Sequence, residues 1–205
     1  MNQDCITQGT EGYERFIPLF IESSQALDFH EVCKSFKEFL PSPPANILDA
    51  GSGAGQNAAA LALLGFTVTA IEPMPEFLNA AKNAYKNIPV KWLSDSLPLL
   101  SSLGSASGLF DFILIDGVWH HLNEAEREQA VIRLSTIIRA KGKCAISLRN
   151  GPAGMGTCVY PTEATRTIES FKKYGFECIL NLQNQPSILS YKEDVKWSRL
   201  VLQKQ

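Results

Sequence analysis

Long hydrophobic runs are missing from this sequence of 205 residues. No stretch of about 18 apolar residues could form a membrane-spanning helix, and the first residues, Met-Asn-Gln-Asp-Cys, lack the basic and apolar regions of a signal peptide. The net charge of −2 gives no strong general attraction to phosphate backbones or anionic lipids. We therefore expect neither a membrane nor a nucleic acid as a partner.

Cysteine is scarce and scattered. The chain has five cysteines, an odd number, and no two of them form a C-x-x-C pair. This pattern argues against a disulfide framework or a zinc site, and it is typical of proteins of the reducing cytoplasm. We expect a cytoplasmic protein without a metal site.

The order of the apolar segments predicts an α/β fold. The sequence Pro41-Ser42-Pro43-Pro44 separates an amphipathic helix, expected at residues 24–40, from a region of alternating strands and helices. Such alternation is typical of a doubly wound, Rossmann-like and mostly parallel sheet with helices on both faces. The last two strands have no helix between them, so an antiparallel pair is expected there.

Seven strands are expected, at residues 46–49, 66–71, 90–93, 110–115, 143–148, 176–182 and 195–202. Helices are expected at residues 56–64, at 75–85, from a cap at Asn123 to a stop at Gly142, and at 162–174. The chain is interpreted as one structural domain, in which residues 1–44 form a helical lead-in over the cofactor site and residues 45–205 form the main domain.

The most informative segment is the turn Asp49-Ala50-Gly51-Ser52-Gly53-Ala54-Gly55, which follows the first strand and leads into a helix. Glycines allow a tight turn and the close approach of a ligand, and a helix start offers unpaired N–H groups. Glu72 ends the next strand about 20 residues later, the spacing at which an acid accepts hydrogen bonds from ribose hydroxyls. The segment predicts a cofactor that contains a nucleoside.

Two details separate this turn from the dinucleotide fingerprint. That fingerprint needs a third small residue three positions after the second glycine, where this chain has Gln56. Asp49 lies two positions before the first glycine, and a carboxylate there suits a cationic, amine-bearing ligand better than a pyrophosphate. An NAD-dependent oxidoreductase is therefore the less favoured alternative.

The segment from Ile47 to Glu72 resembles the first motif of class I S-adenosylmethionine-dependent methyltransferases, and the similarity covers most of the chain from Asn46 onward. The resemblance implies S-adenosylmethionine as the cofactor, with the glycine turn beside its methionine part, Glu72 on its ribose and Asp95 on its adenine. The cofactor-binding residues considered are Tyr13, Asp49, Gly51, Ser52, Gly53, Gly55, Glu72, Pro73, Met74, Asp95, Ser96, Asp116, Gly117 and Val118.

The loops after the fourth and fifth strands carry the candidates for chemistry. His120 and His121 are candidate general bases, since an unperturbed histidine titrates at about pH 6.5. In many family members a histidine here is structural, and adjacent side chains do not easily face one substrate. Arg149 is a candidate to bind a carboxylate or phosphate of the acceptor, with a structural ion pair as the equal alternative. The glycine-rich run at 151–156 could form a lid.

The sequence thus predicts an S-adenosylmethionine-dependent methyltransferase that acts by direct displacement, as a monomer or a homodimer. The ending at residues 194–202 is similar to that of small bacterial methyltransferases of unassigned substrate. No Asn-Pro-Pro-Tyr type of motif and no large inserted domain is visible, which favours a small-molecule acceptor. The other alternative is a noncatalytic S-adenosylmethionine-binding subunit that supports a partner protein.

Overall fold

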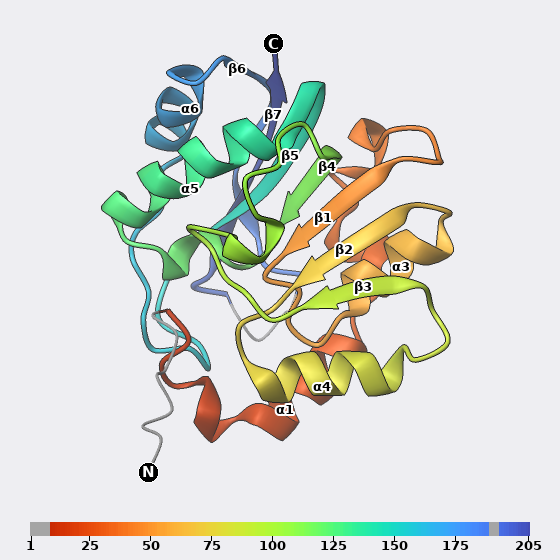
Figure 1. Cartoon of the computed structure of the whole chain (residues 1–205). Coiled ribbons are helices and arrows are strands. Elements are labelled where there is room, and N and C mark those ends of the chain that lie inside the picture. Colours follow the sequence, from red (N-terminus) through yellow and green to blue (C-terminus); the bar gives the residue numbers. More distant parts are fainter. Residues whose placement is uncertain (1–8, 189–192) are drawn as a thin grey trace.

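The computed structural model describes residues 9–188 and 193–205, which form one mixed sheet with helices on both faces (Figure 1). The seven strands lie in the order β3-β2-β1-β4-β5-β7-β6. Neighbours from β3 to β5 are parallel, whereas β7 is antiparallel to both β5 and β6. The expected Rossmann-like sheet with an antiparallel C-terminal pair is confirmed. The strands are β1 (Asn46–Ala50), β2 (Thr67–Ile71), β3 (Val90–Leu93), β4 (Phe110–Ile115), β5 (Ile138–Asn150), β6 (Phe176–Pro186) and β7 (Lys196–Lys204).

The helices bury the two faces of the sheet in separate cores. Adjacent strand residues point to opposite faces, so Ile47 packs on the side of α3 while Leu48 packs on the side of α5. Both side chains are fully buried, as expected for a parallel sheet that is covered on both faces. The helices are η1 (Tyr13–Arg15), α1 (Ile17–Gln25), α2 (Phe29–Val32), η2 (Lys37–Phe39), α3 (Gln56–Leu63), α4 (Pro75–Ala84), η3 (Ser101–Leu103), η4 (Trp119–His121), α5 (Glu124–Ile137) and α6 (Ala164–Lys172), where η marks a 3-10 helix.

The lead-in is not the single helix that was expected at residues 24–40. It is divided into α1, α2 and η2. The break has a local cause: the Asp28 carboxylate accepts a hydrogen bond from the backbone N–H of His30 at 2.8 Å, which starts a new helix. The apolar spacing was still informative. Of the six apolar residues that recur at helical spacing in this segment, Phe29, Val32, Cys33 and Phe36 are buried in the core that contains α3, and Phe39 and Leu40 are partly buried against it.

Helix α5 starts where the sequence predicts but ends earlier. The Asn123 side chain accepts from the N–H of Glu126 at 3.0 Å, and the Glu126 carboxylate accepts from the N–H of Asn123 at 2.7 Å, which completes a capping box. The expected stop at Gly142 is wrong, since the helix ends at Ile137 and β5 begins at Ile138. Pairing of this early β5 segment with β4 replaces the last helical turn.

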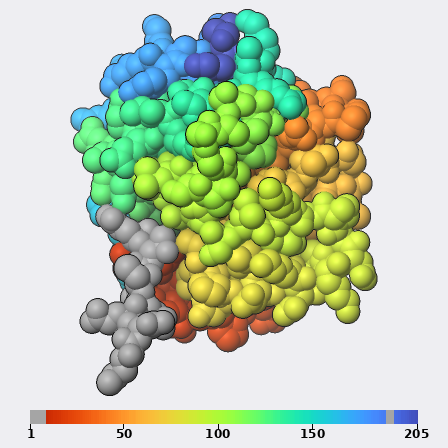
Figure 2. Space-filling view, viewed as in Figure 1, coloured from red at the N-terminus to blue at the C-terminus, as the bar shows by residue number. Residues whose placement is uncertain are grey.

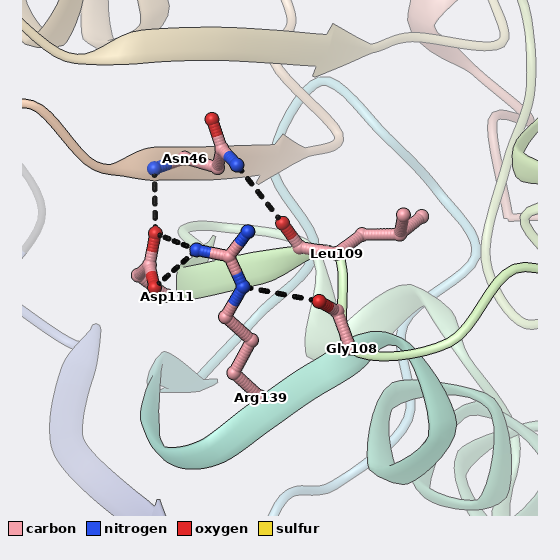
Figure 3. Close-up of polar contacts among 5 residues, drawn as sticks. All are labelled: Asn46, Gly108, Leu109, Asp111 and Arg139. Atoms are coloured by element: carbon pink, nitrogen blue, oxygen red, sulfur yellow. Dashed lines mark hydrogen bonds and ion pairs between the residues drawn. The ribbon is translucent and has the colours of Figure 1, made fainter.

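A polar cluster holds the amino-terminal ends of β1 and β4 to the start of β5 (Figure 3). Asp111 accepts from the backbone N–H of Asn46 at 2.8 Å and from Nη1 of Arg139 at 2.6 and 2.7 Å. Arg139 Nε also donates to the carbonyl of Gly108, and the Asn46 amide donates to that of Leu109. Burial alone would raise the pKa of Asp111, but the Asn46 N–H and the Arg139 guanidinium hold it below its ordinary value. The cluster lies at the opposite end of the strands from the site described below.

The chain winds in opposite directions from β1, since β2 lies on one side of it and β4 on the other. Open α/β sheets bind ligands beyond the carboxyl ends of the strands at such a point. In Figure 1 the arrowheads of β1, β2 and β4 point toward the side on which the N-terminal segment lies. Figure 2 shows α1 (red) at the surface beneath α4 (yellow). Phe20 of α1 stacks on Phe77 of α4 with ring centroids 4.3 Å apart, which fixes the lead-in beside this edge of the sheet.

Candidate active site

A cavity of about 320 Å³ opens at the carboxyl ends of the central strands. Its volume falls in the range of small-molecule sites, about 300–1,000 Å³. The structure brings most of the residues that the sequence singled out to its wall. Those that line it are Tyr13, Gly51, Ser52, Gly53, Glu72, Pro73, Met74, Ser96, Asp116, Gly117, Val118, His120, His121 and Arg149.

The glycine turn presents bare backbone to this cavity. Gly51 has φ +84° and Gly53 has φ +53°, both in the left-handed region that favours glycine. A Cβ at Gly51 would collide with the side chain of Val118. The N–H groups of Gly51 and Ser52 donate to the carbonyl of Ile71 at 2.8 and 2.9 Å, so the turn is held to the end of β2. Glycine at 51 therefore lets the Val118 side chain pack directly on the turn, and both residues line the cavity.

Glu72 links the turn to helix α4. One carboxylate oxygen accepts from the N–H of Gly53 and the other from the N–H of Met74, both at 2.9 Å. Burial, to 5% exposure, raises the pKa of Glu72 to about 7, although the two N–H bonds oppose the rise. Each oxygen retains a further lone pair, so the carboxylate can accept hydrogen bonds from ligand hydroxyls in the cavity as well.

Asp49 lies beneath the turn and not in the cavity wall. It is 1% exposed, and its Oδ2 has no hydrogen-bond partner among the described residues. Burial first, and then the neighbouring carboxylates of Asp116 and Glu72, raise its pKa to about 8. The three acids together favour a cationic ligand, because a positive charge in the cavity would stabilise their ionised forms.

Gly55 and Asp95 also lie outside the cavity wall. A Cβ at Gly55 would come within 2.7 Å of the Trp92 ring, so this glycine permits close packing behind the turn. Asp95 accepts from the N–H groups of Ser96 and Ser102, at 2.8 and 2.7 Å, and so shapes its own loop. Contact of Asp95 with a cofactor stays a prediction.

His121 joins the N-terminal segment to the loop after β5. Its Nδ1 lies 2.7 Å from the carbonyl of Cys158, which can only accept, so Nδ1 carries the proton. Burial lowers the pKa of His121, and the neutral ring then accepts from the Tyr13 hydroxyl through Nε2 at 3.0 Å. The pKa of Tyr13 is raised to about 12, chiefly by burial, so this hydroxyl keeps its proton. Both nitrogens of His121 are therefore occupied.

His120 lines the same cavity, contrary to the expectation that adjacent histidines do not face one substrate. The 3-10 turn η4 sets the two rings 4.1 Å apart at 41° to each other. His120 is 5% exposed, and its Nδ1 has no hydrogen-bond partner within the described parts of the chain. Burial first, and then the nearby His121 and Arg149, lower its pKa well below the ordinary value. The ring is therefore neutral at physiological pH.

The loop after β5 closes against the N-terminal segment. The N–H of Thr157 donates to the carbonyl of Glu11 at 2.7 Å. A Cβ at Gly156 would overlap the Tyr13 ring and would lie 2.9 Å from Cε1 of His121. Only a residue without a side chain fits at 156, and Gly154, Met155 and Gly156 of the glycine-rich run line the cavity. A lid role for the run stays a prediction.

Sequence reasoning missed several cavity residues on α1, α3 and β7. Phe20 and Asn57 line the cavity, as do Trp197 and Arg199 of the last strand. Asn57 donates to the carboxylate of Asp116 at 3.4 Å. A signal was available for β7: strand periodicity puts Trp197 and Arg199 on one face. That this face borders the cavity depends on the position of β7 next to β5, which the sequence does not state.

Among the residues described, no group of three or more His, Cys, Asp or Glu side chains is placed to hold a metal ion. The described cysteines, 33, 144, 158 and 178, are free thiols, and Cys5 lies outside the described residues. Within the described part of the chain, every helix is too short or too polar to cross a membrane.

Comparison with known proteins relates part of the chain to methyltransferases. Residues 48–146 match the methyltransferase-domain family. An uncharacterized methyltransferase of Mycobacterium tuberculosis is 31% identical over 111 residues, which cover 51% of this chain and 54% of that protein. The match therefore spans about half of the length of that relative.

Solved structures share the fold at low identity. A TehB-like S-adenosylmethionine-dependent methyltransferase of Corynebacterium glutamicum superposes with a TM-score of 0.68 at 21% identity, covering 94% of this chain and 98% of that one. A second structure is the 1,6-didemethyltoxoflavin-N1-methyltransferase of Burkholderia thailandensis, solved with 1,6-didemethyltoxoflavin and S-adenosylhomocysteine. It superposes with a TM-score of 0.67 at 16% identity, covering 100% of this chain and 93% of that one. Residues 48–146 are thus similar to methyltransferase domains, and the chain shares its fold with S-adenosylmethionine-dependent methyltransferases of known structure.

Proposed function

We propose that the chain transfers a methyl group from S-adenosylmethionine to a small-molecule acceptor. The observation that carries the proposal is that the glycine turn and Glu72 share one cavity with polar side chains from β5 and η4. A cofactor site and an acceptor site thus adjoin. We propose the cytoplasm as its location, consistent with the free thiols of the described cysteines.

The residues present fit the cofactor. Glu72 lines the cavity, where its carboxylate can accept from ribose hydroxyls, and the Gly51 backbone, which also lines it, can lie beside the methionine part. The buried Asp49, with an oxygen that lacks a partner among the described residues, and the cavity-lining Asp116 suit the ammonium and sulfonium charges. When bound, S-adenosylmethionine supplies an activated methyl group, which an acceptor atom takes by direct displacement.

The protein's part in this reaction is alignment and exclusion of water. The Tyr13–His121 hydrogen bond and the Thr157–Glu11 contact close the N-terminal segment and the loop after β5 over the cavity. Closure holds an acceptor in position and keeps out competing water. His120 is the better candidate for a base, because both nitrogens of His121 are already bonded. Its low pKa suits an acceptor that gives up its proton readily.

The cavity size supports a small acceptor. A volume of about 320 Å³ lies at the lower end of the range of small-molecule sites. The Burkholderia protein of similar fold binds a small molecule, 1,6-didemethyltoxoflavin, together with S-adenosylhomocysteine. Both observations favour a small molecule over a nucleic acid or a protein.

Isothermal titration with S-adenosylhomocysteine and with NAD tests the cofactor. We expect binding of the first and none of the second; binding of NAD alone would contradict the proposal. Incubation with tritiated-methyl S-adenosylmethionine and cell extract tests the reaction, and we expect label in the small-molecule fraction. Label confined to macromolecules would contradict a small acceptor. Cofactor binding without label in any fraction would favour the noncatalytic subunit.

A further inference from the structure

Two arginines lie on one face of the sheet beside the cavity. In the β5–β7 pair, Arg149 lies opposite Trp197 and Arg199 lies opposite Ser147. The two arginines are therefore diagonal neighbours on the same face, a relation that places residues about 7–8 Å apart. Both side chains line the cavity, as does Trp197 between them.

Neither arginine is neutralised by an acid in the described structure. No carboxylate of residues 9–188 or 193–205 lies within 4.0 Å of either guanidinium. Arg149 is only 9% exposed, and its Nη2 donates to the carbonyl of Pro152 at 2.6 Å. Nη1 of Arg199 is buried without a hydrogen-bond partner among the described residues. Buried cations are costly unless they are paired, so this pair of guanidinium groups favours an anion.

The acids of the cavity are bonded to groups other than these arginines. Asp116 is bonded to Asn57, and Glu72 to the turn, where we propose that the cationic cofactor binds. Placing the cofactor there satisfies these carboxylates and leaves the arginines without a counter-ion. An acceptor that fills the remaining space can supply one.

Arg199 has aromatic rings beside it, and part of the cavity wall is apolar. The Arg199 guanidinium carbon lies 5.0 Å from the Trp197 ring centroid and 6.0 Å from that of Phe36. Leu27, Val32 and Ile188 also line the cavity. An occupant should therefore combine a charged end with an apolar or aromatic body.

We propose that Arg149 and Arg199 bind the carboxylate of the methyl acceptor, and that the acceptor is a small apolar or aromatic acid. This inference rests on the proposed function and specifies its substrate class. A carboxylate offers two oxygens to two planar guanidinium groups. The Phe36 and Trp197 rings beside Arg199 offer few donors to the further oxygens of a phosphate.

The test uses the complex of the full chain with S-adenosylhomocysteine. Benzoate, its neutral isostere benzamide, and phenyl phosphate are titrated against this complex by calorimetry and by thermal shift. We expect benzoate to bind and benzamide to bind at least about 10-fold more weakly, because a buried charge-assisted bond is lost. Arg199→Gln should weaken benzoate binding by about 10- to 100-fold and Arg199→Lys by less, since lysine keeps the charge.

Arg166→Gln is the matched control, because it removes one positive charge from a side chain that is 70% exposed. Equal affinity for benzoate and benzamide would overturn the proposal, and so would tighter binding of phenyl phosphate than of benzoate. An Arg199→Gln variant that loses S-adenosylhomocysteine affinity to the same extent would also overturn it, because the arginine would then serve the methionine carboxylate. If the unaltered chain fails to bind S-adenosylhomocysteine, the proposed function fails; if that complex forms but does not distinguish benzoate, only this inference fails.

Discussion

Replacement of Glu72 by alanine perturbs both the fold and the cofactor site. The carboxylate accepts two N–H bonds of 2.9 Å, from Gly53 and Met74, at a position that is 5% exposed. Hydrogen bonds to charged groups contribute about 1.5–3 kcal/mol each, and a carboxyl with a pKa near 7 is only partly ionised at neutral pH, so the lower values apply. We expect the free energy of unfolding to fall by about 2–3 kcal/mol, which lowers Tm by roughly 4–12 °C in a chain of this size.

The same change should weaken S-adenosylhomocysteine binding by about 10- to 100-fold, since ribose hydrogen bonds worth about 1.5–3 kcal/mol are lost. Isothermal titration at a temperature where both proteins are folded measures this, and calorimetric melting measures Tm. Glu76→Ala is the matched control, because Glu76 is an exposed glutamate of α4 outside the cavity wall. An unchanged dissociation constant would refute the ribose role of Glu72, and an unchanged Tm would refute its role in holding the turn.

Three further predictions concern protons and hydrogen bonds. Burial raises the pKa of Asp49 to about 8, so the stability that its protonated carboxyl contributes is lost as pH rises from about 4 to 8. S-adenosylmethionine is a cation, so it should bind more tightly as pH rises from about 6 to 8.5, and the proton that its binding releases should appear as a buffer-dependent binding enthalpy. S-adenosylhomocysteine should show less of this effect. Tyr13→Phe removes the 3.0 Å bond to His121 and should weaken S-adenosylhomocysteine binding by about 5-fold in isothermal titration; equal affinity would contradict its role in closure. Asp111→Asn should lower the free energy of unfolding in urea at pH 7 by only about 1 kcal/mol, since Arg139 is partly exposed. The pKa of Asp111 is depressed in the folded state, so the difference in stability between the two proteins should vanish as pH falls through that pKa. A difference that persists at low pH would argue against the ion pair.

The part of the cavity wall that we propose for the cofactor was largely predictable from the sequence. The turn at Gly51, the acid at Glu72 and the segment from Asp116 to Val118 are local motifs that follow strands, and parallel strands bring their carboxyl ends to one edge. The part that we propose for the acceptor was less predictable. Arg199 lies on a strand whose position beside β5 arises from antiparallel pairing at long sequence separation, and no local motif marks it.

Sequence alone determined the class of fold, the order of strands and helices along the chain, and the cap of α5 at Asn123, since these depend on apolar periodicity and on residues three or four positions apart. Tertiary structure decided the rest. The break of the lead-in at Asp28 and the end of α5 at Ile137 depend on competing hydrogen bonds and strand pairing that periodicity does not encode. The same holds for the bond between Tyr13 and His121, which joins residues 108 positions apart and closes the cavity only because the folded sheet brings both chain segments to its edge.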